Sequence, residues 1–362
     1  MRILHVANFA YNKHGYAFYN CDRKISAGFV RNGHFVYEFS LRDMARMGTV
    51  FRSKRFGAPW ANAEILRICG QMRPEMVLLG HADVLFPDTL RRIRELLPDT
   101  RIAQWYVDPL FVPGKTNFIR AFAPYLDAVF ATTGGEWLEQ LTPPTLLRGY
   151  LPNPVDPAIE RLTNFRQQAF PYELIYCGTV GDDLARERFM QNLLHSLSDM
   201  PVRLHGLLGQ PKVNGNCYAE ALASARMGLN HSRRNDVTLY SSDRIAQLTG
   251  NGLLTLSPRI PGFESLYRTD EICYFDTLDE LVDNVRYYHR NPELAAAKAA
   301  AGWRRAHQSY GAERIARFIE EATFRQPYSE PYEWLAHVFN PSPATIPALS
   351  TARHSAAWSQ AR

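Results

Sequence analysis

Short apolar runs alternate with amphipathic patterns through the first 141 residues. Continuous apolar runs predict buried strands, and five occur, at residues 3–7, 34–39, 76–79, 102–107 and 128–132. Apolar positions at helical spacing predict helices after them, ending near residue 32 and lying near 61–73, 86–97, 116–124 and 135–141. Because strands and helices alternate, we expect parallel strands with crossover helices in an open α/β sheet.

The alternation stops at residues 142–158, where the sequence TPPTLLRGYLPNPVDPA contains five prolines. Such a composition is typical of a linker, so we place a domain boundary there. The N-terminal domain then covers residues 1–150 and a second domain covers 151–325. The remaining segment, 326–362, is rich in Pro, Ser and Ala and is expected to be partly packed or disordered.

The second half repeats the same alternation. Apolar runs predict strands at 174–178, 202–207, 227–230 and 253–256, with helices at 216–226 and 242–250 among them. Thr277, with Glu280 three residues later, predicts a capping box that opens another helix. Two further helices are expected, from Pro292 to about residue 307 and then to about residue 324. The fold class is therefore α/β, with two Rossmann-like domains and a ligand cleft between them.

The net charge of +5 is unevenly distributed. Residues 1–150 contain 19 Lys and Arg against 13 Asp and Glu, whereas the remainder contains 22 against 23. Part of the excess is a cluster formed by Arg42, Arg46, Arg52, Lys54 and Arg55. The cluster indicates either a solvated helix face and loop or attraction to an anionic membrane surface or a phosphorylated acceptor. Because no nucleic-acid-binding motif occurs, DNA and RNA are not expected partners.

Cysteine usage and hydropathy bear on the compartment. The five cysteines are dispersed without a C-x-x-C pair, which indicates reduced thiols rather than disulfides or a zinc site. The first apolar run is too short for a secretory signal, and no run has transmembrane length. A cytoplasmic protein is therefore expected. No D-x-D, phosphate-loop or G-x-S-x-G motif occurs, so neither a diphosphate-bound metal nor a serine nucleophile is predicted.

Candidate chemistry in the N-terminal half lies where strands end, because ligands of open α/β sheets bind beyond the carboxyl ends of the strands. The loop 8–15 after the first strand contains His14 and Gly15, and is either a close backbone approach to a ligand or a plain surface loop. His81 and Asp83 follow the third strand, and Asp108 follows the fourth. A carboxylate at that place suits a general base or a sugar-hydroxyl acceptor. The alternative for His81 is a hydrogen-bonded histidine at the edge of the core.

Two segments of the C-terminal half suit a diphosphate. Gly178 and Thr179 open a glycine-containing turn, and Arg186 follows one helical turn later. Ser241, Ser242 and Arg244 stand at a helix start, where free N–H groups and partial positive charge accumulate. The alternatives are solvated arginines in the first segment and an ordinary helix cap in the second. Glu264 suits ribose or sugar hydroxyls, or is a surface carboxylate.

Together these segments resemble glycosyltransferases of the GT-B fold, and most closely the spore-maturation CgeB-like group among the family-1 and family-4 type enzymes. The likeness covers roughly residues 1–320. It is carried by EMVLLGHADVLFPDTLRRIRELLPDTRIAQWYVDP, by the linker YLPNPVDP, and by IYCGTVGDDLARERFMQNLL, YAEALASARMGLNHSR, SSDRIAQLTGNGLLTLS and IPGFESLY in the second half.

The resemblance implies a nucleotide-diphosphate sugar on the C-terminal domain, an acceptor on the N-terminal domain, and neither a metal nor another cofactor. The catalytic candidates are Asp108 and His81, and the acceptor-binding candidates are His14, Gly15 and Asp83. The implied donor-binding residues are Gly178, Thr179, Arg186, Asn230, Tyr240, Ser241, Ser242, Arg244, Gln247 and Glu264.

Two positions depart from the family pattern. Gln247 stands where relatives usually place a Glu that contacts the donor ribose, and Thr179 stands where many have Arg. The expected function is glycosyl transfer to a saccharide or lipid-linked acceptor in cell-surface glycan synthesis, in the cytoplasm or peripherally at the inner face of the membrane. The departures leave a non-catalytic GT-B module that binds a glycan or nucleotide as an alternative, with a nucleotide-sugar epimerase as another.

Overall fold

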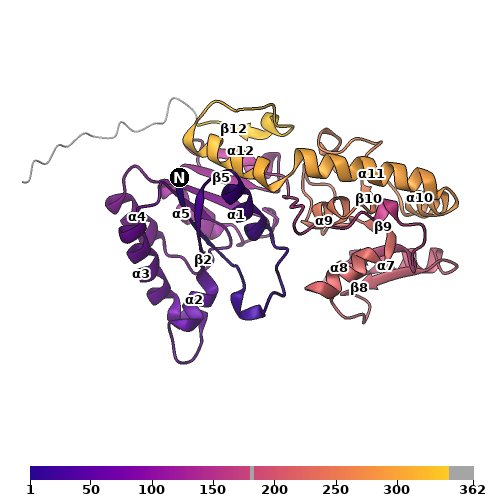
Figure 1. Ribbon diagram of the computed structural model, residues 1–362, viewed down its shortest axis with the longest axis horizontal. Helices are drawn as coiled ribbons and strands as arrows, with labels where there is room; N and C mark the ends of the chain where they lie inside the picture. Colours follow the sequence, from indigo (N-terminus) through magenta and orange to yellow (C-terminus); the bar gives the residue numbers. More distant parts are fainter. Residues whose placement is uncertain (180–182, 342–362) are drawn as a thin grey trace, which may run out of the picture.

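The computed structural model describes residues 1–179 and 183–341, which form two α/β domains lying side by side (Figure 1). The N-terminal domain contains a seven-stranded sheet with the order β12-β6-β5-β4-β3-β1-β2. Its first six strands in chain order pair in parallel, as the strand–helix alternation predicted. They are β1 (Arg2–Ala7), β2 (Phe35–Ser40), β3 (Met76–Leu79), β4 (Arg101–Tyr106), β5 (Ala128–Ala131) and β6 (Leu147–Tyr150).

The helices of this domain overlap the predicted positions, but the helix expected at 61–73 begins seven residues earlier, at Lys54, and one helix is additional. The helix α2, at Leu41–Met47, was not predicted, because its seven residues are too few for a distinct periodic pattern. The strand β6 was also missed, because it lies inside the proline-rich stretch taken as a linker. The other helices are α1 (Cys21–Arg31), α3 (Lys54–Met72), α4 (Pro87–Leu96), α5 (Asn117–Phe122) and α6 (Glu136–Glu139), with short 3₁₀ turns at Tyr11–Lys13 and Ala123–Tyr125.

The C-terminal domain contains a parallel five-stranded sheet with the order β11-β10-β9-β7-β8. The predicted N-cap is present, since the Thr277 side chain accepts from the Glu280 N–H at 3.2 Å. The Glu280 side chain accepts from the Asp276 N–H at 2.7 Å, one residue before the N–H that a capping box would engage. The strands are β7 (Tyr172–Cys177), β8 (Val202–His205), β9 (Ala225–Leu229), β10 (Leu254–Pro258) and β11 (Cys273–Phe275), of which β11 was not predicted. The helices are α7 (Leu184–Ser196), α8 (Asn216–Ala223), α9 (Arg244–Gly250), α10 (Leu278–Arg290) and α11 (Pro292–Ser309).

The end of the described chain returns to the N-terminal domain. Helix α12 (Ala312–Phe324) packs along α1 and touches β4 and β5, and it lies over the N-terminal sheet in Figure 1. The strand β12 (Val338–Phe339) then pairs antiparallel with β6. Residues 312–339 thus complete the N-terminal domain in space, although the sequence pattern assigned them to the C-terminal domain and to the tail. The predicted tail beyond residue 341 lies outside the described residues.

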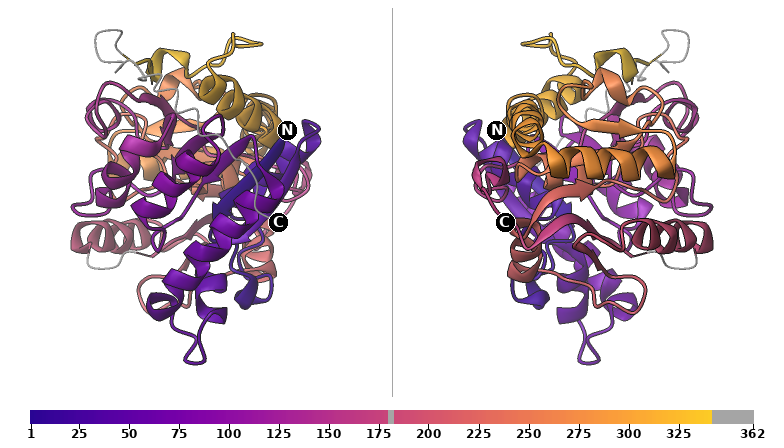
Figure 2. Two further views of the ribbon diagram at one scale, coloured as in Figure 1. Left: turned by 90° about the vertical axis from the view of Figure 1, so that its left-hand side faces the viewer. Right: turned by 90° about the vertical axis from the view of Figure 1, so that its right-hand side faces the viewer.

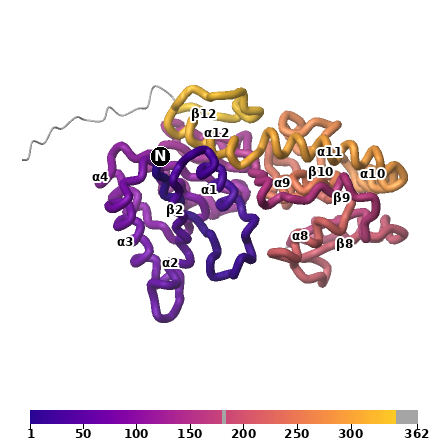
Figure 3. The backbone as a smooth tube through the Cα atoms, in the orientation of Figure 1, coloured from indigo at the N-terminus to yellow at the C-terminus, as the bar shows by residue number. Residues whose placement is uncertain are grey.

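The chain therefore crosses between the domains twice, as the tube in Figure 3 traces. The crossings lie side by side, because the Val155 N–H donates to the Tyr310 carbonyl and the Ala312 N–H donates to the Val155 carbonyl, each at 2.8 Å. Two paired segments restrict relative domain movement more than one linker does.

The contact of α1 with α12 requires a glycine. A Cβ atom on Gly28 would lie 2.1 Å from the Ala312 carbonyl oxygen, whereas a Cβ on Gly70 of α3 would meet nothing within 4 Å. We expect Gly28→Ala to destabilise the protein by about 1–3 kcal/mol through overpacking. The control, Gly70→Ala, should be neutral or stabilising by up to about 1 kcal/mol. Urea unfolding midpoints measure both, and equal midpoints for the two variants would contradict the close α1–α12 approach.

Candidate active site

Two adjacent cavities lie between the domains, at the carboxyl ends of the two sheets. The first, which we call the basic cleft, has a volume of about 270 Å³. The second, which we call the acidic cleft, has a volume of about 350 Å³. Asp243 lines both, so the two cavities adjoin at that residue. The basic cleft includes Gly178, Thr179, His205, Lys212 and Arg244. The acidic cleft includes Asp22, Arg42, His81, Asp108, Tyr240 and Ser242.

His81 and Asp108 meet in the acidic cleft. Each stands two residues beyond its strand, and β3 and β4 are neighbours in the sheet, so the side chains converge. His81 Nε2 lies 3.0 Å from Asp108 Oδ2. Burial by itself lowers the pKa of His81, but Asp108 raises it above its ordinary value. The hydrogen bond with His81 lowers the pKa of Asp108 in turn. The structure thus brings the two catalytic candidates together as a hydrogen-bonded acid–base pair.

Asp22 is a residue of the acidic cleft that the sequence analysis missed. It stands in the first turn of α1 and is 5% exposed. Its Oδ1 accepts a hydrogen bond from Trp105 Nε1 at 2.8 Å and lies 3.4 Å from His5 Nε2. Glycine at position 80 leaves room for this carboxylate, because a Cβ there would lie 2.1 Å from Asp22 Oδ1. The sequence signal was an acidic residue at the start of the helix that follows the first loop.

Arg244 and Arg186 hold the loop that follows β7. Arg244 Nε donates to the Cys177 carbonyl at 2.9 Å, and its guanidinium lies 4.6 Å from the centre of the Tyr176 ring. Arg186 is buried, and its Nη2 donates to the Thr179 carbonyl at 2.6 Å. A Cβ on Gly178 would lie 2.7 Å from Arg244 Nη2, so glycine lets the guanidinium approach. Gly178, Thr179 and Arg244 line the basic cleft, whereas residues 180–182 of the predicted glycine turn lie outside the described residues.

The segment 240–244 contributes to both clefts. Tyr240 and Ser242 line the acidic cleft from the C-terminal domain. Ser241 and Asn230 lie behind them and are buried. Ser241 Oγ donates to Asn230 Oδ1 at 3.3 Å, and Asn230 Nδ2 donates to the hydroxyl of Ser257 at 3.1 Å. These two candidates therefore support the loop rather than line either cleft.

Four further candidates lie outside the two clefts. Glu264 is exposed and forms an ion pair with Arg259. Asp83 accepts from Arg42 Nε at 2.7 Å and from Lys54 Nζ at 3.0 Å, so both of its oxygens are engaged. His14 and Gly15 belong to an exposed loop and adopt left-handed φ angles of 50° and 84°.

Lys212 and His205 were missed in the basic cleft. Lys212 lies on the connection from β8 to α8, in which Gly206, Gly209 and Gly215 all have positive φ. The glycines that allow this path were visible in the sequence. They follow a strand and precede a helix. The same arrangement of glycines led to the prediction of a ligand-binding turn after β7.

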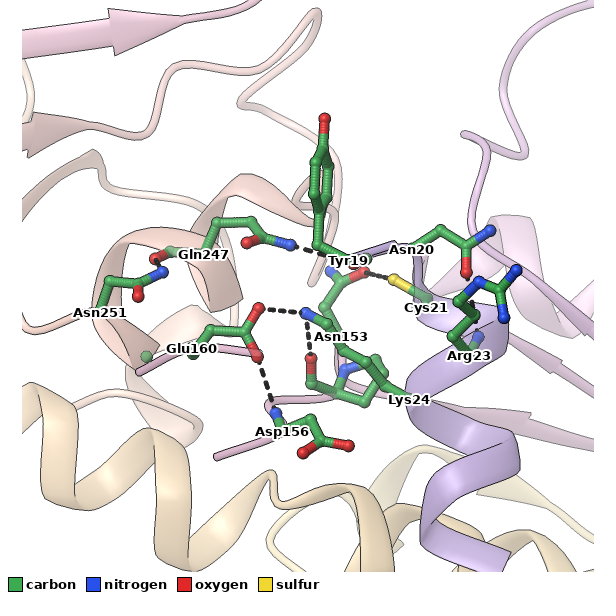
Figure 4. Close-up of polar contacts among 12 residues, drawn as sticks. Tyr19, Asn20, Cys21, Arg23, Lys24, Asn153, Asp156, Glu160, Gln247 and Asn251 are labelled. Atoms are coloured by element: carbon green, nitrogen blue, oxygen red, sulfur yellow. Dashed lines mark hydrogen bonds and ion pairs between the residues drawn. The ribbon is translucent and has the colours of Figure 1, made fainter. Parts of the chain in front are cut away.

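Gln247 belongs to a buried polar cluster that joins the domains (Figure 4). Lys24 Nζ of α1 lies 2.6 Å from Glu160 Oε1, and both side chains are 0% exposed. Lys24 also donates to the Pro154 carbonyl at 3.1 Å. With its amide oriented to suit both neighbours, Gln247 donates to Glu160 at 3.0 Å and accepts from Lys24 at 3.2 Å. Burial by itself lowers the pKa of Lys24, but Glu160 raises it above its ordinary value.

This cluster gives a physical reason for the departure at position 247. A glutamate there would place a second buried carboxylate within hydrogen-bonding distance of Glu160, where like charges repel. A neutral amide donates to one member of the ion pair and accepts from the other. Gln247 also lines a third cavity, of about 460 Å³, which shares Tyr19 and Tyr218 with the basic cleft.

Within the part of the chain that the structure describes, no group of three or more His, Cys, Asp or Glu side chains is arranged to hold a metal ion. In residues 1–179 and 183–341, no helix combines the length and apolar character needed to cross a bilayer.

Comparisons with known proteins agree with this fold. Residues 186–321 match the family model described as glycosyl transferase-like. No curated protein matches the chain. The solved structure of AviGT4, a glycosyltransferase involved in avilamycin A biosynthesis, is similar with 14% identity and a TM-score of 0.57, over 90% of this chain and 97% of that one.

Two other solved structures show the same likeness. HepE from Anabaena, in complex with UDP and glucose, has 13% identity and a TM-score of 0.57, over 90% of this chain and 100% of that one. Sucrose-phosphate synthase from Thermosynechococcus elongatus has 11% identity and a TM-score of 0.57, over 90% and 99%. At these identities the likeness shows the fold. The GT-B architecture and the resemblance to GT-B glycosyltransferases are therefore confirmed.

The buried ion pair generates a stability prediction. Lys24→Met leaves the Glu160 carboxylate buried without its cation, and we expect it to destabilise the protein by about 3–5 kcal/mol. The double variant Lys24→Met/Glu160→Met should recover most of that loss, because no unpaired charge remains. Thermal or urea unfolding of the four proteins in the cycle measures the coupling. Additive single-variant effects would contradict the interpretation.

Proposed function

We propose that this chain transfers a glycosyl unit from a nucleotide-diphosphate sugar in the basic cleft to an acceptor hydroxyl in the acidic cleft. The observation that carries the proposal is the junction of the two cavities at Asp243. Cationic side chains lie on one side of the junction and a His–Asp pair lies on the other. A sugar at the junction would have its leaving group among the cations and the incoming hydroxyl near the pair.

The leaving group of such a reaction is a nucleoside diphosphate. The ammonium of Lys212 and the guanidinium of Arg244 line the basic cleft and suit its negative charge. Glycine at position 178 lets the Arg244 guanidinium lie close to the backbone at this cleft. HepE, which shares the fold, is in complex with UDP and glucose, which supports a nucleotide-sugar donor. The proposal assigns no metal to the donor, because Lys212 and Arg244 offer positive charge to the diphosphate in this cavity.

On the acceptor side, the bond from the acceptor oxygen to the anomeric carbon forms as the bond from that carbon to the diphosphate breaks. The leaving diphosphate keeps the bonding electron pair, and the proton of the acceptor hydroxyl passes to the His81–Asp108 pair. Asp22 offers a carboxylate in the same cavity to the hydroxyls of a saccharide. A saccharide or lipid-linked acceptor, from cell-surface glycan synthesis, fits this polar cavity.

Donor binding is tested with the purified full-length chain. Thermal shift and calorimetry with UDP, GDP, ADP and their sugar conjugates should identify one binding base. Lys212→Ala should weaken the affinity for that nucleotide about tenfold, since one charge-assisted contact is lost. The exposed Lys13 provides the matched control, because it lies outside both clefts. Failure of every nucleotide and nucleotide-sugar to bind would refute the proposal.

Catalysis by the pair predicts a pH dependence. A general base must be unprotonated, so kcat/KM should rise with pH through the raised pKa of His81. Asp108→Asn should lower kcat by about 10²–10⁴-fold. It should also move the acidic limb of the profile to lower pH, because burial then acts on His81 without the carboxylate that raises its pKa.

The same measurement separates the proposal from a non-catalytic GT-B module. Such a module would bind the nucleotide-sugar without releasing nucleotide diphosphate in the presence of any acceptor, and Asp108→Asn would change nothing. A nucleotide-sugar epimerase would convert the donor without an acceptor.

A further inference from the structure

The connection between α2 and α3 exposes large apolar side chains at one point of the N-terminal domain. We call residues 47–56 the hairpin tip. Val50 is 96% exposed, Phe51 86%, Met47 74% and Phe56 70%, the four highest values among the exposed large apolar residues of the described chain. Single exposed apolar residues are ordinary on protein surfaces, but a contiguous group of this kind marks an interaction site.

The hairpin tip has a defined backbone. The Arg52 N–H donates to the Thr49 carbonyl at 3.0 Å, which closes a turn with Val50 and Phe51 at its centre. The Ser53 N–H donates to Thr49 Oγ1 at 3.2 Å. Arg52 itself adopts a left-handed φ of 49°. The two most exposed apolar side chains are thus held at the apex of a hydrogen-bonded turn.

The two helices below the turn are closely packed. A Cβ on Gly57 of α3 would lie 1.6 Å from the Ala45 carbonyl oxygen of α2, and a Cβ on Gly48 would lie 2.6 Å from the Trp60 ring. Glycine at position 57 allows the backbones of α2 and α3 to touch, and glycine at position 48 leaves room for the Trp60 ring. Figures 1 and 2 show the resulting hairpin projecting away from the rest of the molecule.

The side chains around the apex include several basic residues. Arg46 pairs with Asp43, and Lys54 pairs with Asp83. Among the described residues, Arg52 and Arg55 have no ion-pair partner, and both are exposed. The apex therefore combines unsatisfied apolar area with two guanidinium groups that no carboxylate neutralises.

We propose that the hairpin tip docks on an anionic lipid bilayer, with Val50, Phe51 and Phe56 entering the headgroup region and Arg52 and Arg55 contacting lipid phosphates. A narrow projecting apex suits a fluid, planar surface, which needs no complementary pocket. Basic residues beside it are attracted to anionic lipids. A second copy of this chain would bring two basic tips together, which charge repulsion disfavours.

Docking would orient the acidic cleft. Arg42, which lines that cleft, stands near the start of α2, and the seven residues of α2 span about 10 Å before the tip begins. A bilayer at the tip would therefore lie close to the acceptor-side cavity. This last step rests on the proposed function and narrows the acceptor to a glycolipid or another lipid-linked saccharide, whereas the docking itself does not depend on it.

The test is co-sedimentation of the full-length chain with two kinds of vesicle. One contains phosphatidylcholine alone, and the other contains phosphatidylcholine with about 30% phosphatidylglycerol, which gives it an anionic surface. We expect binding to the anionic vesicles only, weakened by added salt. Val50→Asp/Phe51→Asp should lower the partition coefficient at least about tenfold. Arg52→Gln/Arg55→Gln should lower it about tenfold or more on anionic vesicles.

The matched control is Tyr287→Asp/Leu294→Asp, which adds the same two charges to exposed apolar positions on α10 and α11. It should bind vesicles like the unchanged protein. Equal binding of both double aspartate variants would overturn the docking proposal. So would equal binding to the two vesicle types, or a concentration-dependent dimer in lipid-free buffer that Val50→Asp/Phe51→Asp abolishes, which would assign the tip to an interface between copies.

The docking proposal and the glycosyl-transfer proposal can be refuted independently of each other. The tip variants should bind nucleotide like the unchanged protein, because no tip residue lines either cleft. Vesicle binding without any nucleotide binding would leave the docking standing and remove the proposed function. Nucleotide binding and turnover without vesicle binding would leave the proposed function standing and remove the docking.

Discussion

Lys24 and Glu160 form an ion pair with both side chains removed from solvent, and this pair constrains how the two domains meet. Charges that are fully buried persist only when each is paired and hydrogen-bonded. Lys24 belongs to α1 of the first domain, whereas Glu160 follows the first crossing. Separating the domains at this point would therefore break the ion pair and leave both charges without a partner. Gln247 of α9 extends the same network into the second domain.

The position of the two clefts follows from that junction. With α1 held against the crossing and α9, the loops after β3 and β4 face the segment 240–244 of the other domain. Asp243 then lies between a cavity with cations and a cavity with carboxylates. The second crossing at Tyr310–Ala312 pairs with Val155 and sends α12 back onto α1, which reinforces the same arrangement. The clefts are therefore a property of the interdomain contact rather than of either sheet alone.

Contacts within each domain explain why some residues with promising chemistry are not in the clefts. Arg186 was expected to face a diphosphate, and in the structure it is buried and donates to the Thr179 carbonyl. Asn230 and Ser241 are hydrogen-bonded to each other. Asp83 is engaged by Arg42 and Lys54. Each has a residue type that suits a ligand, but a partner within the chain already satisfies it.

Local pattern determined much of this protein: apolar runs identify most strands, helical spacing identifies most helices, and the position of Asp108 and His81 after neighbouring strands anticipates their meeting. These features depend on residues close together in the chain or on the regular pairing of parallel strands. The tertiary structure alone decided that Lys24 pairs with Glu160, that Asp22 and Lys212 line the clefts, and that α12 completes the first domain. Such contacts join residues far apart in sequence through the packing of whole domains, and no periodicity along the chain records which distant partner a polar side chain will meet.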